Sequence, residues 1–375
     1  MNPMTDSPSG TAPFRSSFTQ NAAARTDAER AAILADPGFG VNFTDHMFLT
    51  EWTPAEGWHD ARVVPYGPLL LDPATAVLHY AQEIFEGLKA YRHADGSVWA
   101  FRIEANAERL QRSAHRLALP ALPVEWFTGS VQALVTADEA WVPSGEETSL
   151  YLRPFMFASE AFLGVRPSKH VTYSVIASPA GAYFPGGVTA VDLWLSSTYS
   201  RAGAGGTGAA KCGGNYAASL LPQAEAAEQG CAQVVFLDAT EQRWIEELGG
   251  MNLYFVQSDG SIVTPELSGS ILEGITRDSI MTIAGDLGHQ VVERRVSIDE
   301  WREGVADGTI TEVFACGTAA VVTPVGRLKW DGGEVATEAA ADGTSGKVTA
   351  EIRSALVDVQ YGRAEDRHGW MTRLA

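Results

Sequence analysis

The sequence predicts an α+β protein with two domains. Its 375 residues are enough for two domains that each bury a core of their own. Strand-like runs that turn back in hairpins alternate with helical stretches, which indicates antiparallel sheets and helices and not one doubly wound sheet. A segment with three glycines and a proline, GAYFPGGV at residues 181–188, divides the chain near its middle and is typical of a link between domains.

The predicted boundaries follow these changes in composition. Residues 1–38 begin with a stretch rich in Ser, Thr, Pro and Gly, so we expect a flexible N-terminal arm. Residues 39–182 should form the smaller N-terminal α+β domain. Residues 183–190 should form the linker, and residues 191–375 the larger C-terminal domain.

The first half of the chain contains strand and helix signals in turn. Residues 88–102 contain Asp95-Gly96 between two alternating apolar runs, a strong hairpin signal. The stretch EANAERLQRSAHRLAL has apolar residues at helical spacing and charges on the other face. Other segments are short strands in residues 44–71, a second helix in 125–142, and strands at 149–158 and 170–179.

The second half repeats this mixture. The strand VDLWLSS precedes a glycine-rich loop, the helix NYAASLLPQAEAAEQG and the strand AQVVFLD. A hairpin is predicted in MNLYFVQSDGSIVT, where Asp259-Gly260 forms the turn. ITRDSIMTIAGDLG should form a helix that ends at Gly288.

Composition excludes several classes of protein. The net charge of -19 argues against nucleic acid and anionic membranes as partners. No apolar run approaches the roughly 20 residues of a membrane span, and the N-terminus lacks the apolar core of a secretory signal. Three cysteines without a CxxC pair favour a reducing cytoplasm, and no metal site is expected.

The glycine-rich segment RAGAGGTGAAKCGGNYAASL, residues 201–220, allows two familiar interpretations. Gly203 to Gly208 spell GxGxxG, the fingerprint of dinucleotide-binding oxidoreductases, but the helix is predicted to start only near Asn215 and no acid follows where a ribose needs one. A phosphate-binding P-loop needs Gly-Lys-Ser/Thr, whereas this chain has Gly-Ala-Ala-Lys-Cys. The first interpretation stays as an alternative, and the second fails.

Lys211 in this segment is either an ordinary solvated lysine on a surface loop or a nucleophile. A lysine that forms a Schiff base must attack an aldehyde at neutral pH and later carry a proton, so it has to be held in place. Gly213 and Gly214 would let the backbone approach a flat cofactor closely. Tyr216 could reach the phenolic oxygen of a pyridine ring.

Eight separated motifs decide between these interpretations. They are FTDHMFLTEW, HYAQEIFEGLKAYR, LYLRPFMFASEAFLGV, GAYFPGG, KCGGNYAASL, EELGGMNLYF, LEGITRDS and EVFACGTAAVVTPVG. From about Phe39 to its end, the chain resembles the branched-chain amino acid aminotransferases of the fold-type IV pyridoxal-phosphate family, in the larger animal and actinobacterial subgroup. The resemblance implies a two-domain fold like that of D-amino-acid aminotransferase, with pyridoxal 5'-phosphate bound by the C-terminal domain.

The resemblance assigns the cofactor site. Lys211 matches the lysine that holds the cofactor as a Schiff base and acts as general acid and base. Glu247, which is favoured over its neighbour Glu246, matches the carboxylate that binds the pyridine nitrogen. The remaining matches are Tyr216 for the ring oxygen and Arg109, Ile275, Thr276 and Thr318 for the phosphate.

The substrate pocket is assigned in the same way. The family matches for its walls are Phe39, Tyr80, Phe85, Tyr151, Arg153 and Tyr183. The amides of Ala319 and Ala320 match the group that binds the substrate α-carboxylate. Leu163 and Val165 match a loop that enters the pocket of the partner subunit, which implies a homodimer.

The chain departs from the family at two places. Animal relatives carry a redox CxxC where Ala320 and Thr323 stand, so that thiol switch should be absent. Gly250 stands where relatives often have Thr, which removes one hydroxyl near the substrate. Cys212, next to Lys211, is expected only to pack.

The resemblance therefore implies a cytoplasmic transaminase. It would move the amino group of L-leucine, L-isoleucine or L-valine to 2-oxoglutarate, giving the 2-oxo acid and L-glutamate in a reversible ping-pong reaction. Within the same fold, a D-amino-acid aminotransferase or an aminodeoxychorismate lyase is the alternative. The substrates are small molecules in each case.

Overall fold

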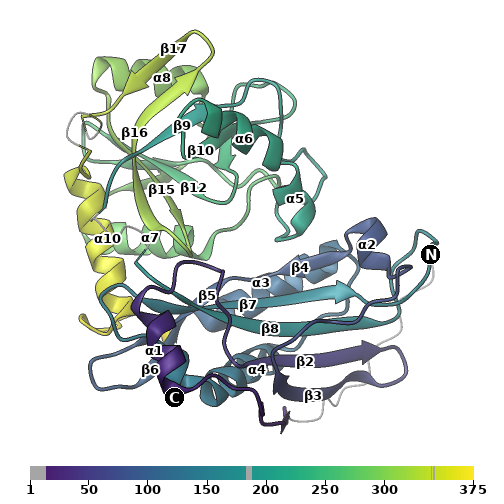
Figure 1. Ribbon diagram of the computed structural model, residues 1–375. Helices are drawn as coiled ribbons and strands as arrows, with labels where there is room; N and C mark the ends of the chain where they lie inside the picture. The colour runs from purple at the N-terminus through teal and green to yellow at the C-terminus, as the bar shows by residue number, and fades with distance from the viewer. Residues whose placement is uncertain (1–13, 183–187, 339, 341–342) are drawn as a thin grey trace.

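The computed structural model describes residues 14–182, 188–338, 340 and 343–375. The chain folds around two nine-stranded sheets, one built mostly from the first half of the chain and one from the second, and Figure 1 shows them as two lobes. Strands in both sheets are mostly antiparallel and helices pack beside them. The predicted α+β class is confirmed.

The first sheet has the strand order β1-β3-β2-β8-β7-β5-β6-β18, and β4 adds to β7. Its strands are β1 Ser17–Phe18, β2 His46–Thr53, β3 Gly57–Pro65, β4 Glu83–Phe85, β5 Leu88–Arg92, β6 Val98–Phe101, β7 Ser149–Ala158, β8 Val171–Ala180 and β18 Met371–Arg373. The predicted hairpin is β5–β6, and Gly96 at its turn has a φ of 87°, which glycine adopts without strain. β7 and β8 are the two strands predicted for residues 149–158 and 170–179.

Helices of the first half cover this sheet. They are α1 Asp27–Ala35, α2 Ala76–Tyr80, α3 Ile103–Arg116 and α4 Val124–Ala137, followed by the 3₁₀ turn Glu139–Trp141. α3 buries Ile103, Ala107, Leu110 and Ala114, which recur every three or four residues, so its apolar stripe faces the core as the spacing predicted. Most charged residues of the helix are exposed on its other side, whereas Arg109 is buried.

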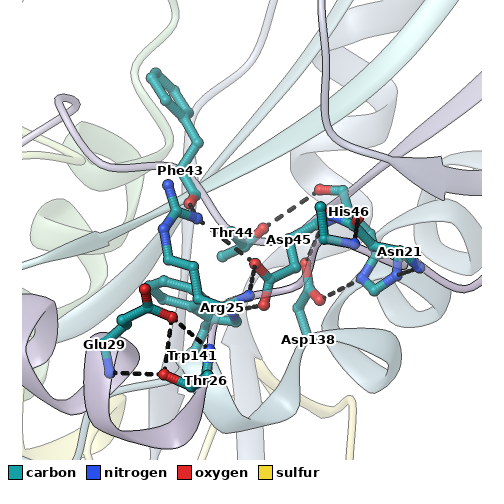
Figure 2. A network of polar contacts seen from close by, with 11 residues as sticks. Asn21, Arg25, Thr26, Glu29, Phe43, Thr44, Asp45, His46, Asp138 and Trp141 are labelled. Carbon is teal, nitrogen blue, oxygen red and sulfur yellow. Dashed lines mark hydrogen bonds and ion pairs between the residues drawn. The ribbon is translucent and has the colours of Figure 1, made fainter.

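The segment before residue 39 differs from the flexible arm that its composition suggested. From Phe14 onward it includes β1, which pairs with β3, and helix α1, which starts with a capping box between Thr26 and Glu29. Figure 2 shows the polar network that ties this segment to the first sheet. The Asn21 amide donates to Nε2 of His46 at 3.1 Å, and Nδ1 of His46 lies 2.7 Å from Asp138. Composition missed these contacts because their partners lie far along the chain.

The second sheet has the order β11-β10-β9-β16-β15-β12-β13-β14, with β17 on β16. Its strands are β9 Val191–Leu195, β10 Gln233–Leu237, β11 Ile245–Leu248, β12 Asn252–Gln257, β13 Ile262–Thr264, β14 Val291–Glu293, β15 Ile310–Gly317, β16 Val321–Trp330 and β17 Gly333–Ala336. The hairpin predicted at Asp259-Gly260 is β12–β13. Of the predicted linker 183–190, residues 183–187 lie outside the described residues.

Helices of the second half are α5 Gly213–Ala217, α6 Leu220–Glu228, α7 Ile275–Asp286, α8 Ile298–Asp307 and α10 Lys347–Gln360. The single helix predicted from Asn215 is therefore two short helices, α5 and α6. The helix predicted after Gly274 is α7. Among the helices of the described chain, none is long and apolar enough to cross a membrane.

The two lobes are joined by a shared core and by the end of the chain. Tyr91 and Phe101 of the first sheet pack with Tyr254, Phe314 and Ile352 of the second half. β18, near the C-terminus, pairs with β6, so the last residues belong to the first sheet although the composition assigned them to the C-terminal domain. This contact fixes how the two lobes face each other.

Candidate active site

Lys211 lies at the end of the loop that joins β9 to α5. Figure 1 shows α5 on the side of the second lobe that faces the first. Three contacts with the first lobe hold its backbone. The Lys211 amide donates to Oγ of Ser113 at 3.0 Å, and the Phe85 amide donates to the Lys211 carbonyl at 3.0 Å. The Gly213 amide donates to the carboxylate of Glu83. A lysine on a glycine-rich loop is thereby given a fixed position.

The side chain of Lys211 meets a phenol and an aromatic ring. Its Nζ donates to the hydroxyl of Tyr216 at 2.7 Å, as expected from their spacing on the turn that starts α5. Nζ also lies 4.9 Å from the centre of the Phe85 ring, and the Phe85 and Tyr216 rings are 4.9 Å apart. An amine in this setting can exchange a proton with the phenol or with a group bound above the ring.

Glu247 on β11 is buried and forms an ion pair with Arg201. Nη1 of Arg201 lies 2.8 Å from Oε1 of Glu247, and the Leu272 amide donates to the same oxygen at 2.8 Å. Arg201 is itself buried and also donates to the carbonyl of Ser270 at 3.1 Å. The neighbouring Glu246 accepts a hydrogen bond from the Ser270 hydroxyl instead. The two adjacent acids thus have different partners.

Burial raises the pKa of Glu247 to about 7, although Arg201, the Leu272 amide and Lys211 all act to lower it. In the unfolded chain the group should titrate near 4.5. Between these two values the folded state keeps a proton that the unfolded state has lost. The stability that this group contributes is therefore lost as the pH rises from about 4.5 to about 7.

We therefore expect the melting temperature of the ligand-free wild-type protein to fall as the pH rises through this range. The melting temperature of Glu247→Gln should fall less over the same range. Thermal unfolding at several pH values, followed by circular dichroism, measures the difference. Glu228→Gln is a suitable control because Glu228 is exposed at the end of α6. Equal pH dependence in wild type and Glu247→Gln would contradict the raised pKa.

Groups suited to an anion converge near the start of α7. α7 begins at Ile275 after Gly274 without a side-chain cap, so its first amides are available to a ligand. Ile275 and Thr276 line a small cavity together with Thr318 and Lys89. The structure thus brings together three of the four residues predicted to hold a phosphate.

Arg109, the fourth predicted phosphate residue, reaches the same region from α3. Its Nε and Nη2 donate to Glu86 at 2.8 and 2.7 Å, and its Nη1 donates to the Glu273 carbonyl just before α7 at 3.1 Å. A guanidinium has five N–H donors, so donors remain for an anion after these contacts. Glu86 was not predicted, and it compensates the charge of a buried arginine.

The turn between β15 and β16 carries Thr318, Ala319 and Ala320. These residues line a cavity of about 320 Å³ with Tyr216 and Gly250. Val321, the next residue, has a φ of 60°, a left-handed conformation that is strained for a β-branched side chain. Residues held under strain in a turn are often placed for binding.

Lys89 supports this turn from the first lobe. Its Nζ donates to the carbonyl of Ala319 at 2.9 Å. The side chain is buried within β5, and burial lowers the pKa of Lys89 to about 8. Sequence reasoning missed Lys89, although a lysine between apolar residues of a predicted strand was a detectable signal.

Aromatic and basic side chains of the first lobe face Lys211. The Arg153 guanidinium lies 4.7 Å from the centre of the Phe85 ring and donates to the Tyr151 hydroxyl at 3.1 Å. The ring of Phe39 packs 5.1 Å from that of Tyr151. A side chain at Gly87 would collide with the Tyr151 hydroxyl, so glycine there lets this tyrosine lie flat against the strand. The predicted wall residues Phe39, Phe85, Tyr151 and Arg153 are thus neighbours.

Tyr80, Leu163 and Val165 have different surroundings from these wall residues. The Tyr80 hydroxyl donates to the carbonyl of Leu163, in the loop after β7. The side chains of Leu163 and Val165 in that loop are exposed. Tyr183 lies outside the described residues.

Sequence reasoning also missed Arg201, Ser113 and Glu83. Arg201 lies 46 positions before Glu247, and Ser113 and Glu83 come from a different lobe than Lys211. No local pattern marks such partners. Arg201 alone gave a weak signal, because it is the one charged residue before a run of small ones.

The donor set fits pyridoxal phosphate. The site offers an amine and a phenol in contact, a buried carboxylate next to a buried arginine, and helix amides without a cap beside Thr318. These are the groups that would bind an aldehyde, a phenolic oxygen, a ring nitrogen and a phosphate. By contrast, residues 203–208 precede α5 by several positions, so the GxGxxG segment does not start a helix as a dinucleotide site requires.

The three cysteines are buried, and Gly250 borders the cavity beside Tyr216. Cys212, Cys231 and Cys316 are free and buried. Cys212 packs in the core of the first lobe, as expected from its small size. A Cβ added at Gly250 would lie 3.4 Å from the Tyr216 ring, so glycine leaves this side of the cavity wider.

The chain matches one protein family and is similar to individual proteins along nearly its whole length. The model described as "Amino-transferase class IV" matches residues 83–328. The probable branched-chain-amino-acid aminotransferase of Streptomyces coelicolor is 61% identical over 351 residues, which cover 93% of this chain and 96% of that protein. The branched-chain-amino-acid aminotransferase of Mycolicibacterium smegmatis is 58% identical over 366 residues, covering 96% of this chain and 99% of that protein.

Solved structures share the fold. A branched-chain amino acid aminotransferase of T.th. with pyridoxamine 5'-phosphate has a TM-score of 0.72 and 32% identity, covering 87% of this chain and 98% of its own. The branched-chain amino acid aminotransferase from Escherichia coli has a TM-score of 0.69 and 30% identity, covering 88% of this chain and 99% of its own.

Proposed function

Since the chain belongs to the class IV aminotransferase family, we propose that it moves the amino group of L-leucine, L-isoleucine or L-valine to 2-oxoglutarate. It is a transaminase with pyridoxal 5'-phosphate as its cofactor. The observation that carries the proposal is the contact of Lys211 with Tyr216 and Phe85, together with the buried Glu247–Arg201 pair of the same lobe, whose carboxylate the charge of Lys211 reaches.

When bound, the cofactor supplies an aldehyde that takes up the amino group and a ring that withdraws electrons from the substrate Cα. Lys211 would hold the cofactor through Nζ, and the same amine would carry the Cα proton of the substrate. Its backbone anchors to Ser113 and Phe85 keep the amine within reach of that carbon. Tyr216 would hold the ring oxygen and accept the Nζ hydrogen bond in turn.

Glu247 would keep a proton on the ring nitrogen. Its pairing with Arg201 holds one carboxylate oxygen in place, and its burial keeps water from competing for the nitrogen. Arg109, Ile275, Thr276 and Thr318 would hold the phosphate, with the uncapped start of α7 contributing amides. The amides of Ala319 and Ala320, on the turn supported by Lys89, would bind the substrate α-carboxylate.

The wall formed by Phe39, Phe85 and Tyr151 suits an apolar side chain. Arg153, stacked on Phe85, offers a positive charge to the side-chain carboxylate of glutamate. One pocket can therefore serve both half-reactions. Because the first product, the 2-oxo acid, leaves the pocket before the second substrate, 2-oxoglutarate, binds there, the kinetics should be ping-pong.

A panel of amino donors with 2-oxoglutarate as acceptor tests the proposal. Leucine, isoleucine and valine should each react, glutamate should form, and the purified protein should be yellow. Reaction with D-alanine in preference to L-leucine would favour a D-amino-acid aminotransferase. Formation of pyruvate and aminobenzoate from aminodeoxychorismate would favour the lyase, and a colourless protein that binds NAD would favour an oxidoreductase.

A homodimer is the second part of the proposal. Leu69, Leu70, Leu78, Leu163 and Val165 are exposed, and Leu70 and Val165 are 101% and 88% accessible. The loop after β7 lies beside the segment before α2, because the Phe162 amide donates to the Ala74 carbonyl and Thr75 pairs with Ala161. The two segments thus form one apolar patch, and exposed apolar patches usually mark contact surfaces. A second copy of the chain would cover this patch. Leu163 and Val165 of each subunit would then lie at the pocket of the other subunit.

Subunit mixing tests this assignment. Lys211→Ala subunits and subunits with Leu163→Asp and Val165→Asp should each be inactive alone. If the loop completes the pocket of the neighbour, exchanged dimers contain one pocket with both parts intact, and about a quarter to a half of the activity per dimer should return. Proven heterodimers without recovery would leave the loop acting within its own chain.

The cytoplasm is the third part of the proposal. All three cysteines are free thiols, and a reducing compartment keeps thiols in this state. Fractionation of cells that produce the protein, followed by an activity assay, tests this location. Activity in an exported fraction would contradict it.

A further inference from the structure

A half-buried face of the first sheet forms the wall opposite Lys211. Along β7 the side chains alternate, so Leu152, Pro154 and Met156 are buried in the core whereas Tyr151, Arg153 and Phe155 are half-buried on the other face. β4 continues this face with Glu83 and Phe85, since Phe85 pairs with Phe155 and Glu83 pairs with Phe157. The contacts of Phe85 with Lys211 and Arg153 place this face against the substrate side chain.

Glu83 contributes a carboxylate to this face. One of its oxygens accepts the hydrogen bond from the Gly213 amide, two residues after Lys211. Burial raises the pKa of Glu83, while the Gly213 amide and the charge of Arg153 act in the opposite direction. The Glu83 carboxylate is thus partly shielded from water, and it interacts with the charge of Arg153 at a distance, without a direct ion pair between the two side chains.

We infer that Glu83 is a specificity-determining residue whose negative charge opposes the binding of dicarboxylic substrates in the pocket above Phe85. The inference rests on the proposed function. Arg153 alone would favour glutamate and 2-oxoglutarate, whose side-chain carboxylates it can pair with, over apolar side chains. The carboxylate of Glu83, two residues before Phe85 on β4, weakens this preference for dicarboxylic substrates. One pocket can therefore release glutamate as readily as it accepts leucine.

Glu83→Gln separates the charge from the hydrogen bond. The amide oxygen of glutamine still accepts from Gly213, so the backbone beside Lys211 keeps its anchor, while the charge is removed. Two unreactive acids serve as probes of the holoenzyme: glutarate, with two carboxylates, and 4-methylvalerate, with one. Titration calorimetry measures both dissociation constants, and steady-state kinetics measures KM for glutamate and for leucine.

For Glu83→Gln we expect glutarate to bind more tightly, on the order of five-fold, as expected when one partly screened like charge is removed at this range. The dissociation constant of 4-methylvalerate should stay within about two-fold, and KM should fall for glutamate but not for leucine. Glu83→Asp, which keeps the charge, should retain the wild-type ratio. Glu228→Gln, an exposed control with the same change in net charge, should change neither constant.

Two results would overturn the inference. An equal change for both acids would mean that Glu83 acts only through Gly213 and the position of Lys211. No change for either acid, in a variant with wild-type melting temperature, would mean that its charge does not reach the pocket. A wild-type enzyme that neither binds 4-methylvalerate nor transaminates leucine would instead contradict the proposed function.

Discussion

Lys211→Ala is expected to lower transaminase turnover by at least about 10²-fold, the usual contribution of a positioned acid–base group. Nζ of Lys211 is the amine next to Tyr216 and Phe85. Lys89 of the first lobe is buried and directed at the Ala319 carbonyl, so it cannot take over. Single-turnover loss of the leucine α-proton, followed with deuterated leucine, measures the step that Lys211 carries out.

Lys169→Ala is a matched control, since Lys169 is exposed on the loop before β8. This control should keep wild-type turnover. The Lys211 variant should still fold, because the anchors to Ser113 and Phe85 use its backbone and alanine keeps both. If more than about a tenth of the turnover remained in Lys211→Ala, the assignment of this lysine would be wrong.

Glu247→Gln should keep its cofactor and lose most of its turnover. A neutral amide no longer favours a proton on the ring nitrogen, and each unit by which the pKa of that nitrogen falls costs about ten-fold in the protonated fraction. The glutamine side chain of this variant can still accept from the Leu272 amide, so the strand geometry should persist. We therefore expect at least about a ten-fold loss of turnover, with cofactor content measured by absorbance.

The adjacent acid supplies the comparison. Glu246 accepts from the Ser270 hydroxyl, a contact that glutamine can reproduce, so Glu246→Gln should keep nearly all of its turnover. If Glu246→Gln were inactive and Glu247→Gln active, the other carboxylate would serve the ring nitrogen. Loss of cofactor from Glu247→Gln would mean that Glu247 holds the cofactor ring in place and does not act through the pKa of the ring nitrogen.

The predicted secondary structure was most accurate where a segment carried its own signal. Such local patterns are the strand-like runs of β7 and β8, the Asp-Gly turns of the two hairpins and the apolar stripe of α3, and each gave the observed element. The N-terminal segment and the final strand were misjudged from composition. β1 and β18 are short strands whose pairing partners lie elsewhere in the chain, on β3 and β6.

For the site, the sequence by itself predicted which residues carry the chemistry, because Lys211, Tyr216 and Glu247 lie in motifs that resemble those of a known family. Their supporting contacts were decided only by the tertiary structure. The bonds of Lys211 to Ser113, of Glu247 to Arg201 and of Lys89 to Ala319 join residues 98, 46 and 230 positions apart. A charge or hydrogen bond acts over a few ångströms of space, whatever the separation along the chain, so these partners become visible only after the second lobe has folded and the two lobes have packed together.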